Sequence, residues 1–308
     1  MIKQAMEAGI LGCFPSLNYR KKGELETVLQ QLNQFSAGRK HLPGNYGMNL
    51  IVQKSNPSFE KDLEIAVQYK VPVIITSLGN PKKTIEEVHA YGGIVFCDVT
   101  NYEHAKKCFD NGCDGFIAVS QGAGGHAGPY PLPILIDTLK RHFPDTPVLG
   151  AGGIADGRAM YSALSAGASL AYCGTRFIAS TEAPVSQEYK NAIVYSGMSD
   201  IVMTDRISGT PCTIINTDFA KKIGTKQNRF EKWMSKNPRT KKYFKMLIQK
   251  RGFDWLQDAV KPGNYHSLWC AGQTVEVIHD IKPIQLIIEE MMNEFYSVHA
   301  ELQKQFSE

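Results

Sequence analysis

The segment AVSQGAGGHAGPY, residues 118–130, places one histidine inside a glycine cluster directly after an apolar, strand-like run. Four glycines within seven residues let the backbone adopt positive φ angles and approach a ligand closely. His126 is the only side chain there that exchanges a proton near neutral pH. A surface turn is the alternative, but such turns do not normally follow a buried strand. We interpret His126 as a candidate catalytic residue at the carboxyl end of a strand, where ligand sites of parallel α/β folds collect.

Short β-branched runs alternate with longer amphipathic stretches over the first 180 residues, which is typical of repeated βα units and a parallel sheet. The expected strands number seven, at residues 10–15, 46–52, 71–78, 93–99, 115–120, 147–152 and 170–175. The expected helices between them cover residues 23–35, 59–69, 81–91, 102–111, 132–143 and 157–166. This order predicts an α/β fold, a TIM-type (β/α)8 barrel.

A closed barrel of this type has eight strands, and here the pattern lacks the N-terminal one. The helix-like residues 2–7 lead directly into the first expected strand. A barrel that closes differently is the alternative to a shortened form, and we favour the shortened form. Its unpaired strand edges would favour pairing between chains, so a homo-oligomer is among the expected states.

The pattern changes after residue 176. We expect a helix over residues 181–195, an irregular or strand-like segment over 200–216, and an amphipathic helix over 284–305. The predicted organisation is a barrel with the ligand site in residues 1–216, a basic helical insertion or cap in 217–262, and a C-terminal segment and helix in 263–308 that pack back on the barrel.

The basic charge is concentrated in one stretch. Residues 221–251 contain twelve Lys or Arg and one acidic residue, Glu231, so this stretch has a net charge of +11 and the remainder −7. Interleaved aromatic residues make a nucleic acid or an acidic carrier a conceivable partner. No nucleic-acid motif accompanies the charge, so we expect a solvated insertion and no nucleic-acid partner.

Cysteine, histidine and hydropathy patterns exclude several classes. The seven cysteines contain no CxxC pair, and their odd number indicates reduced thiols instead of a disulfide framework. The eight histidines show no HxxxH or HExxH spacing, so no metal is expected. No apolar run approaches the roughly 18 residues of a membrane span, and no signal peptide begins the chain. A cytoplasmic location is therefore the expectation, without a membrane partner.

Two further glycine clusters follow the last two expected strands. Gly152 and Gly153 precede one helix, while Gly174 and Thr175 precede a short turn. In eight-stranded barrels the loops after strands seven and eight often hold a phosphate, because exposed backbone N–H groups and a helix N-terminus favour an anion. These four residues therefore predict a phosphate cup.

Asn49 is a polar residue inside the apolar run of residues 48–52. A buried amide needs a hydrogen-bond partner, which a flavin ring edge or a phosphate would supply. A core amide satisfied by the protein itself is the alternative.

Four motifs together resemble a known family. They are GFIAVSQGAGGHAG at 115–128, PVLGAGGIADGRAM at 147–160, GTRF at 174–177 and WCAGQ at 269–273. In this order they resemble the flavin-dependent nitronate monooxygenases, formerly called 2-nitropropane dioxygenases. The resemblance runs from about residue 8 to residue 281 and is weakest in the basic stretch.

The resemblance implies a TIM barrel that binds FMN without a covalent link, in residues 1–216. His126 would lie over the isoalloxazine ring. The residues that contact FMN would be Asn49, Gln121, Gly124 and Gly153, with Tyr172, Cys173, Gly174 and Thr175 at its phosphate, beside Gly152 of the predicted phosphate cup. The chain departs from the family pattern in two ways: the first strand with its Ala-Pro-Met type motif is missing, and Tyr172 replaces a frequent Gln.

The implied reaction is the oxidation of an alkyl nitronate or nitroalkane by O2 to a carbonyl compound and nitrite. His126 would act as a base toward a neutral nitroalkane or as a hydrogen-bond donor to a nitronate. One alternative is an FMN-dependent enoyl-thioester reductase, for which the basic stretch would receive an acidic acyl carrier. The other is a non-catalytic, shortened barrel that has lost FMN.

Overall fold

The computed structural model describes residues 1–39, 44–53, 55–205, 210–226 and 268–307. The chain divides into two compact units. Unit 1 comprises Met1–Ala118 and Thr138–Leu149, and unit 2 comprises Val119–Asp137 and Gly150–Glu308. From residue 227 on, the expected basic insertion lies outside the described residues.

Seven strands form one parallel sheet and follow each other in chain order, β1-β2-β3-β4-β5-β7-β8. Their bounds are Gly12–Pro15 (β1), Tyr46–Ile51 (β2), Val73–Ser77 (β3), Ile94–Val99 (β4), Gly115–Val119 (β5), Val148–Ala151 (β7) and Leu170–Tyr172 (β8). Each lies within its expected range, so the predicted TIM-type α/β fold with seven strands is confirmed for the described residues. The continuous apolar runs reflect strands that are buried on both faces, as in β2, where five of six residues are buried.

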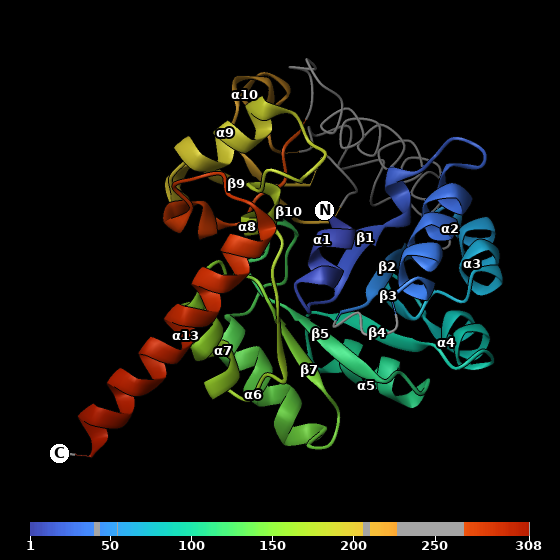
Figure 1. The fold of residues 1–308 in the computed structure, drawn as a ribbon, viewed down its shortest axis with the longest axis horizontal. Coiled ribbons are helices and arrows are strands. Elements are labelled where there is room, and N and C mark those ends of the chain that lie inside the picture. Colours follow the sequence, from blue (N-terminus) through green and yellow to red (C-terminus); the bar gives the residue numbers. More distant parts are fainter. Residues whose placement is uncertain (40–43, 54, 206–209, 227–267, 308) are drawn as a thin grey trace. The chain divides into compact units, whose positions relative to one another are not determined.

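The helices of unit 1 alternate with its strands. They are α1 (Ile2–Glu7), α2 (Glu24–Ala37), α3 (Phe59–Gln68), α4 (Lys82–His89) and α5 (Tyr102–Asp110). Figure 1 shows α2, α3 and α4 side by side along the outer side of β2, β3 and β4. Each of these helices buries an apolar stripe, such as Leu25, Leu29 and Leu32 of α2, against the unit.

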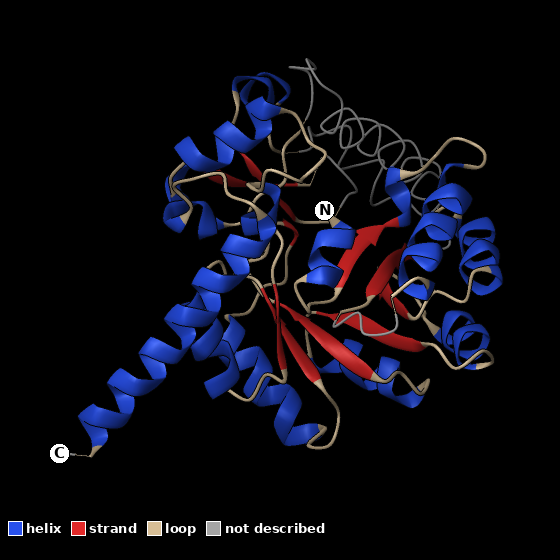
Figure 2. Cartoon of the chain, in the orientation of Figure 1, coloured by secondary structure: helices blue, strands red, loops and turns tan. Residues whose placement is uncertain are grey.

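Unit 2 contains a second sheet and most of the remaining helices. The sheet is antiparallel with the order β6-β10-β9, formed by Gly125–His126 (β6), Cys212–Ile215 (β10) and Ile201–Thr204 (β9). The helices are α7 (Gly157–Ser165), α8 (Thr175–Ile178), α9 (Gln187–Tyr195), α10 (Asp218–Ile223) and α13 (Ile284–Phe306), while α6 (Leu132–His142) spans the boundary between the units. Figure 2 shows α13 as a long helix that runs along α7.

Two expected element boundaries are wrong. The helix expected over residues 181–195 begins only at Gln187, because Ser186 is extended and caps it by accepting a hydrogen bond from Tyr189 N. The strand expected over 170–175 ends at Tyr172, and Thr175 already begins α8. The C-terminal helix is confirmed, one residue longer than its expected end.

All seven cysteines lie in the described residues and none forms a disulfide. Within the described ranges, no helix is long and apolar enough to cross a membrane. The same ranges contain no group of three or more His, Cys, Asp or Glu side chains arranged to hold a metal ion.

Candidate flavin site

The loops that follow β5 and β7 are in direct backbone contact in unit 2. Gly152 has a φ of +103°, and a Cβ atom there would lie 2.4 Å from Ser120 Oγ and 2.5 Å from Ala123 N. Only glycine fits at this position without displacing the loop after β5. Gly153 N donates a hydrogen bond to Gly122 O over 3.2 Å. The structure thus brings two of the three predicted glycine clusters together.

Four of the predicted cofactor residues are exposed on the loops that follow β5, β7 and β8, namely Gln121, Gly124, Gly153 and Gly174. A Cβ atom added to Gly153 or Gly174 would meet no other atom within 4 Å, and Gly153 has a φ of +77°. Bare backbone beside open space allows a ligand to approach more closely than a side chain would. We call residues 122–124, 152–153 and 174 the glycine cup, and this cradle fits a phosphate or a flat ring.

Another segment, residues 271–272, packs against the glycine cup. Gly272 N donates a buried hydrogen bond to Thr175 Oγ1 over 3.0 Å. A Cβ atom at Gly124 would lie 2.7 Å from Gly272 N, and one at Gly272 would lie 2.6 Å from Gly122 O. Ala271 and Gly272 were not among the predicted site residues, although the glycine of the WCAGQ motif is a signal of such close packing.

His126 lies in the short strand β6, where a loop was expected. It pairs with Cys212 of β10, and the neighbouring Thr213 donates from Oγ1 to Ala123 O over 2.5 Å. This partner strand lies far along the chain, so local sequence could not reveal the pairing. Burial lowers the pKa of His126 to about 4, because desolvation disfavours the charged imidazolium. The imidazole is therefore neutral at pH 7.

The two helices that follow the glycine cup begin differently. Asp156 caps α7 by accepting a hydrogen bond from Ala159 N over 2.7 Å, so a carboxylate already occupies that helix N-terminus. α8 begins at Thr175 after Gly174, and no side-chain hydrogen bond caps it. For the residues described, the α8 end of the glycine cup is the better place for an anion, because like charges repel at the α7 end.

Tyr172 and Cys173 connect β8 to the glycine cup, and both are half-buried. Burial raises the pKa of the Cys173 thiol to about 12, and the Asp156 carboxylate raises it further. Cys173 is therefore a neutral thiol at pH 7, and its backbone N–H is the group available to bind an anion.

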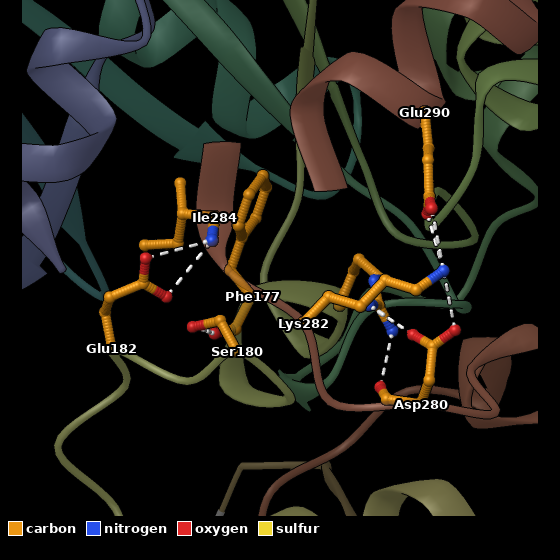
Figure 3. A network of polar contacts seen from close by, with 8 residues as sticks. Phe177, Ser180, Glu182, Asp280, Lys282, Ile284 and Glu290 are labelled. Carbon is orange, nitrogen blue, oxygen red and sulfur yellow. Dashed lines mark hydrogen bonds and ion pairs between the residues drawn. The ribbon is translucent and has the colours of Figure 1, made fainter. Parts of the chain in front are cut away.

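The segment after α8 is fastened to the C-terminal part of unit 2. Figure 3 shows Lys282 between Asp280 and Glu290, with Nζ–O distances of 2.8 Å to each carboxylate. The buried Arg176 of α8 donates two hydrogen bonds to Asp280. The Asp280 carboxylate accepts one over 2.8 Å, and the Asp280 backbone carbonyl accepts the other over 3.0 Å. Glu182 accepts from Ile284 N, the first residue of α13. These contacts hold α8, and with it one end of the glycine cup, to the rest of unit 2.

Asn49 belongs to unit 1, unlike the other nine predicted site residues, which lie in unit 2. Asn49 Nδ2 donates to Ser77 Oγ over 2.7 Å, and the Ser77 hydroxyl donates to Asp98 Oδ2. Burial raises the pKa of Asp98 to about 7, although the hydrogen bond from Ser77 lowers it in part. The amide thus has a protein partner, as the core-amide alternative requires.

Ser77 and Asp98 were not among the predicted site residues. Together with Asn49 they occupy three successive strands, β2, β3 and β4. The signal was present, since both are polar residues near the ends of apolar strands, as Asn49 is. We call Asn49, Ser77 and Asp98 the polar chain of unit 1.

The chain is similar to a known protein family and to several known proteins. The profile of the nitronate monooxygenase family matches residues 18–294. A probable nitronate monooxygenase of Staphylococcus saprophyticus is 29% identical over 213 residues, which are 64% of this chain and 59% of that protein. A (3aS,4S,5R,7aS)-5-hydroxy-7a-methyl-1-oxo-octahydro-1H-indene-4-carboxyl-CoA dehydrogenase of Rhodococcus jostii is 29% identical over 178 residues, 58% of this chain and 50% of that protein.

Among solved structures, the chain is similar to FabK from Thermotoga maritima, with a TM-score of 0.82 and 30% identity over 99% of this chain and 90% of that one. The alignments with the curated relatives described above span only 50 to 59% of those proteins. The family profile nevertheless covers most of the chain. The chain therefore belongs to the nitronate monooxygenase family, a family of flavin-dependent oxidoreductases.

Proposed function

We propose that this chain binds FMN without a covalent link and oxidises alkyl nitronates with O2 to a carbonyl compound and nitrite. The observation that carries the proposal is the glycine cup, in which exposed backbone at Gly153 and Gly174 borders open space and Gly124 directly precedes the strand of His126. Family membership supports a flavin as the occupant. A phosphate and a flat ring both suit a cradle without side chains.

The predicted cofactor-binding residues would hold different parts of FMN. Gly174 and Thr175 at the start of α8 would hold the phosphate, with Tyr172 and Cys173 contributing backbone. The ring would rest against the exposed part of the glycine cup, with contacts from Gln121, Gly124, Gly152 and Gly153, all of which lie in unit 2. When bound, FMN supplies one-electron oxidation of the nitronate.

His126 would act on the substrate. Its pKa of about 4 keeps the imidazole unprotonated at neutral pH, the form that a base toward a nitroalkane needs. The neutral ring also retains one N–H, which can donate to the oxygens of a nitronate that is already ionised. A bound anion would raise the pKa of His126, because opposite charges favour the imidazolium.

A second candidate function is an FMN-dependent enoyl-thioester reductase with an acyl carrier as partner. The specific observation in its favour is the similarity to FabK over nearly the whole chain. Such an enzyme would consume NAD(P)H when an enoyl thioester is added, whereas the proposed function consumes O2 and releases nitrite.

One preparation distinguishes these functions. The purified chain is first examined for flavin absorbance, with and without added FMN, and then assayed for nitrite release from propyl-2-nitronate. Nitrite that depends on O2 and FMN is the expected result. NAD(P)H oxidation stimulated by crotonyl thioester, without nitrite, would establish the reductase, and failure to take up any flavin would establish the non-catalytic alternative.

His126→Ala tests the assigned role. We expect the variant to keep FMN and to lose about 10² to 10⁴ in rate on neutral 2-nitropropane, which is the usual contribution of a positioned acid or base. The loss on preformed nitronate should be smaller, because its proton is already gone. Equal losses on both substrates would show that His126 does not act by taking a proton.

A further inference from the structure

Two thiols of unit 2 lie close together and have no role in the proposed function. Cys212 Sγ and Cys270 Sγ are 3.8 Å apart, although the residues stand 58 positions apart in the chain. Both are free thiols. Sulfurs at this separation need to approach by less than 2 Å to reach the bond length of a disulfide, about 2.05 Å.

The pair is placed by the second sheet. Cys212 begins β10 directly opposite His126 of β6, and directly opposite residues of an antiparallel ladder project to the same face. Cys270 forms a bridge with Ile214 of the same strand β10. A Cβ atom at Gly125 would lie 3.9 Å from Cys270 Sγ. The two thiols therefore lie against the strand that carries His126.

The two sulfurs differ in surroundings. Cys212 is 1% exposed, whereas Cys270 is half-buried. The hydrogen bond between the two sulfurs, together with burial, raises the pKa of the Cys212 thiol well above its ordinary value. A small oxidant therefore reaches the Cys270 sulfur first. The Cys212 thiol lies next to it and can react with the oxidised sulfur.

We propose that Cys212 and Cys270 form a reversible disulfide with hydrogen peroxide as the oxidant. The Cys270 thiolate attacks one peroxide oxygen, the O–O bond breaks, and Cys270 sulfenic acid and hydroxide form. The Cys212 sulfur then attacks the sulfenic sulfur, the S–O bond breaks, and the Cys212 proton leaves with the hydroxyl group as water. Two electrons pass from the two sulfurs to the peroxide. A thiol reductant restores both thiols.

The disulfide would act on the candidate site through the backbone. Cys270 lies two residues before Gly272, which packs on Gly124 and donates to Thr175. Any movement of β10 or of residues 270–272 as the sulfurs approach would reach His126, because β10 pairs with β6 and residues 271–272 contact Gly124 just before β6. The pairing of the thiols does not depend on the proposed function, since it rests on their geometry alone.

The test uses the full chain, reduced and then exposed to hydrogen peroxide. The remaining thiols are alkylated, and the intact mass and peptide masses are measured. We expect the oxidised chain to take up five alkyl groups, whereas the reduced chain takes up seven. The two missing groups should be accounted for by one linked peptide pair that contains Cys212 and Cys270, and dithiothreitol should restore all seven. Cys212→Ser and Cys270→Ser should each abolish that linked pair.

Cys108→Ser is the matched control, because this buried thiol of unit 1 should leave the linked pair unchanged. Three results would overturn the proposal: cross-links between chains in place of the internal pair, sulfinic acid at Cys270 while Cys212 stays a thiol, or oxidation confined to the cysteines of unit 1. Because the primary measurement is on the unaltered chain, a variant that fails to fold does not obscure the answer.

Discussion

Units 1 and 2 place polar groups in opposite ways. In unit 1 the polar chain of Asn49, Ser77 and Asp98 consists of side chains on three regular strands. In unit 2 the glycine cup consists of backbone on irregular loops, held by contacts such as Gly272 N to Thr175 Oγ1. The side chains of the polar chain depend on one another as hydrogen-bond partners, whereas the close backbone approaches of the glycine cup depend on the absence of Cβ atoms. Substitutions should therefore affect the two units differently.

The largest expected effect is a contrast within the glycine cup. Gly152→Ala should lower the free energy of unfolding by about 2 to 5 kcal/mol, because its φ is +103° and the new Cβ would collide with Ser120 and Ala123. Gly153→Ala should cost only about 1 kcal/mol, since its Cβ meets no atom within 4 Å and only the φ of +77° is unfavourable. Urea unfolding of both variants measures the difference.

The two glycine variants also separate stability from binding. Gly153→Ala should fold yet bind FMN more weakly, because its methyl group occupies the open space of the cradle. FMN titration followed by fluorescence quenching measures this. Equal urea midpoints for the two variants would contradict the packing argument, and unchanged FMN affinity in Gly153→Ala would remove Gly153 from the proposed site.

The polar chain should make stability depend on pH in one direction. The pKa of Asp98 is raised from 3.8 to about 7, so the folded state holds its proton more tightly than the unfolded state. The resulting stabilisation is fully present below about pH 4 and is lost as the pH rises through 7. In Asp98→Asn the change in unfolding free energy between pH 5 and pH 8 should be smaller by about 1 to 2 kcal/mol than in the unaltered chain. Urea unfolding at each pH measures this change.

His126 should have the opposite effect. Its pKa is lowered from 6.5 to about 4, so its contribution to stability is present above pH 6.5 and is lost as the pH falls through 4. His126→Gln should reduce the loss of stability between pH 7.5 and 5 by about 1 to 2 kcal/mol. If the unfolding free energy of Asp98→Asn and that of His126→Gln change with pH in the same way, then Asp98 or His126 is not buried as described.

The smallest expected effect concerns the support of the loop before His126. Thr213→Val removes the hydroxyl that donates to Ala123 O and Gly125 O while keeping the side-chain shape. The loss should be about 1 kcal/mol in unfolding free energy, the usual net value of one hydrogen bond. Thr213→Ser is the matched control because it keeps the hydroxyl. A valine variant as stable as the wild type would show that the loop is held by the sheet pairing instead.

The sequence predicted the seven strands and most of their ends because the information is local. Strands buried on both faces must be apolar over their whole length, so runs such as those of β2 and β3 stand out between amphipathic helices. The candidate site was predicted where its signal was also local, as at Gly152, whose positive φ and close contacts demand glycine. The helix start at Gln187 was missed because cap geometry, not apolar period, decides it.

Only the tertiary structure decided which distant segments meet. The sequence determined that His126 follows a strand and a glycine cluster, but the pairing of β6 with β10 and the packing of Gly272 on Gly124 join residues far apart in the chain. The hydrogen bonds between Asn49, Ser77 and Asp98 and the 3.8 Å approach of Cys212 to Cys270 are of the same kind. A single sequence records each residue's own preference, whereas these contacts depend on how strands align and how closely backbones approach, which folding of the whole unit decides.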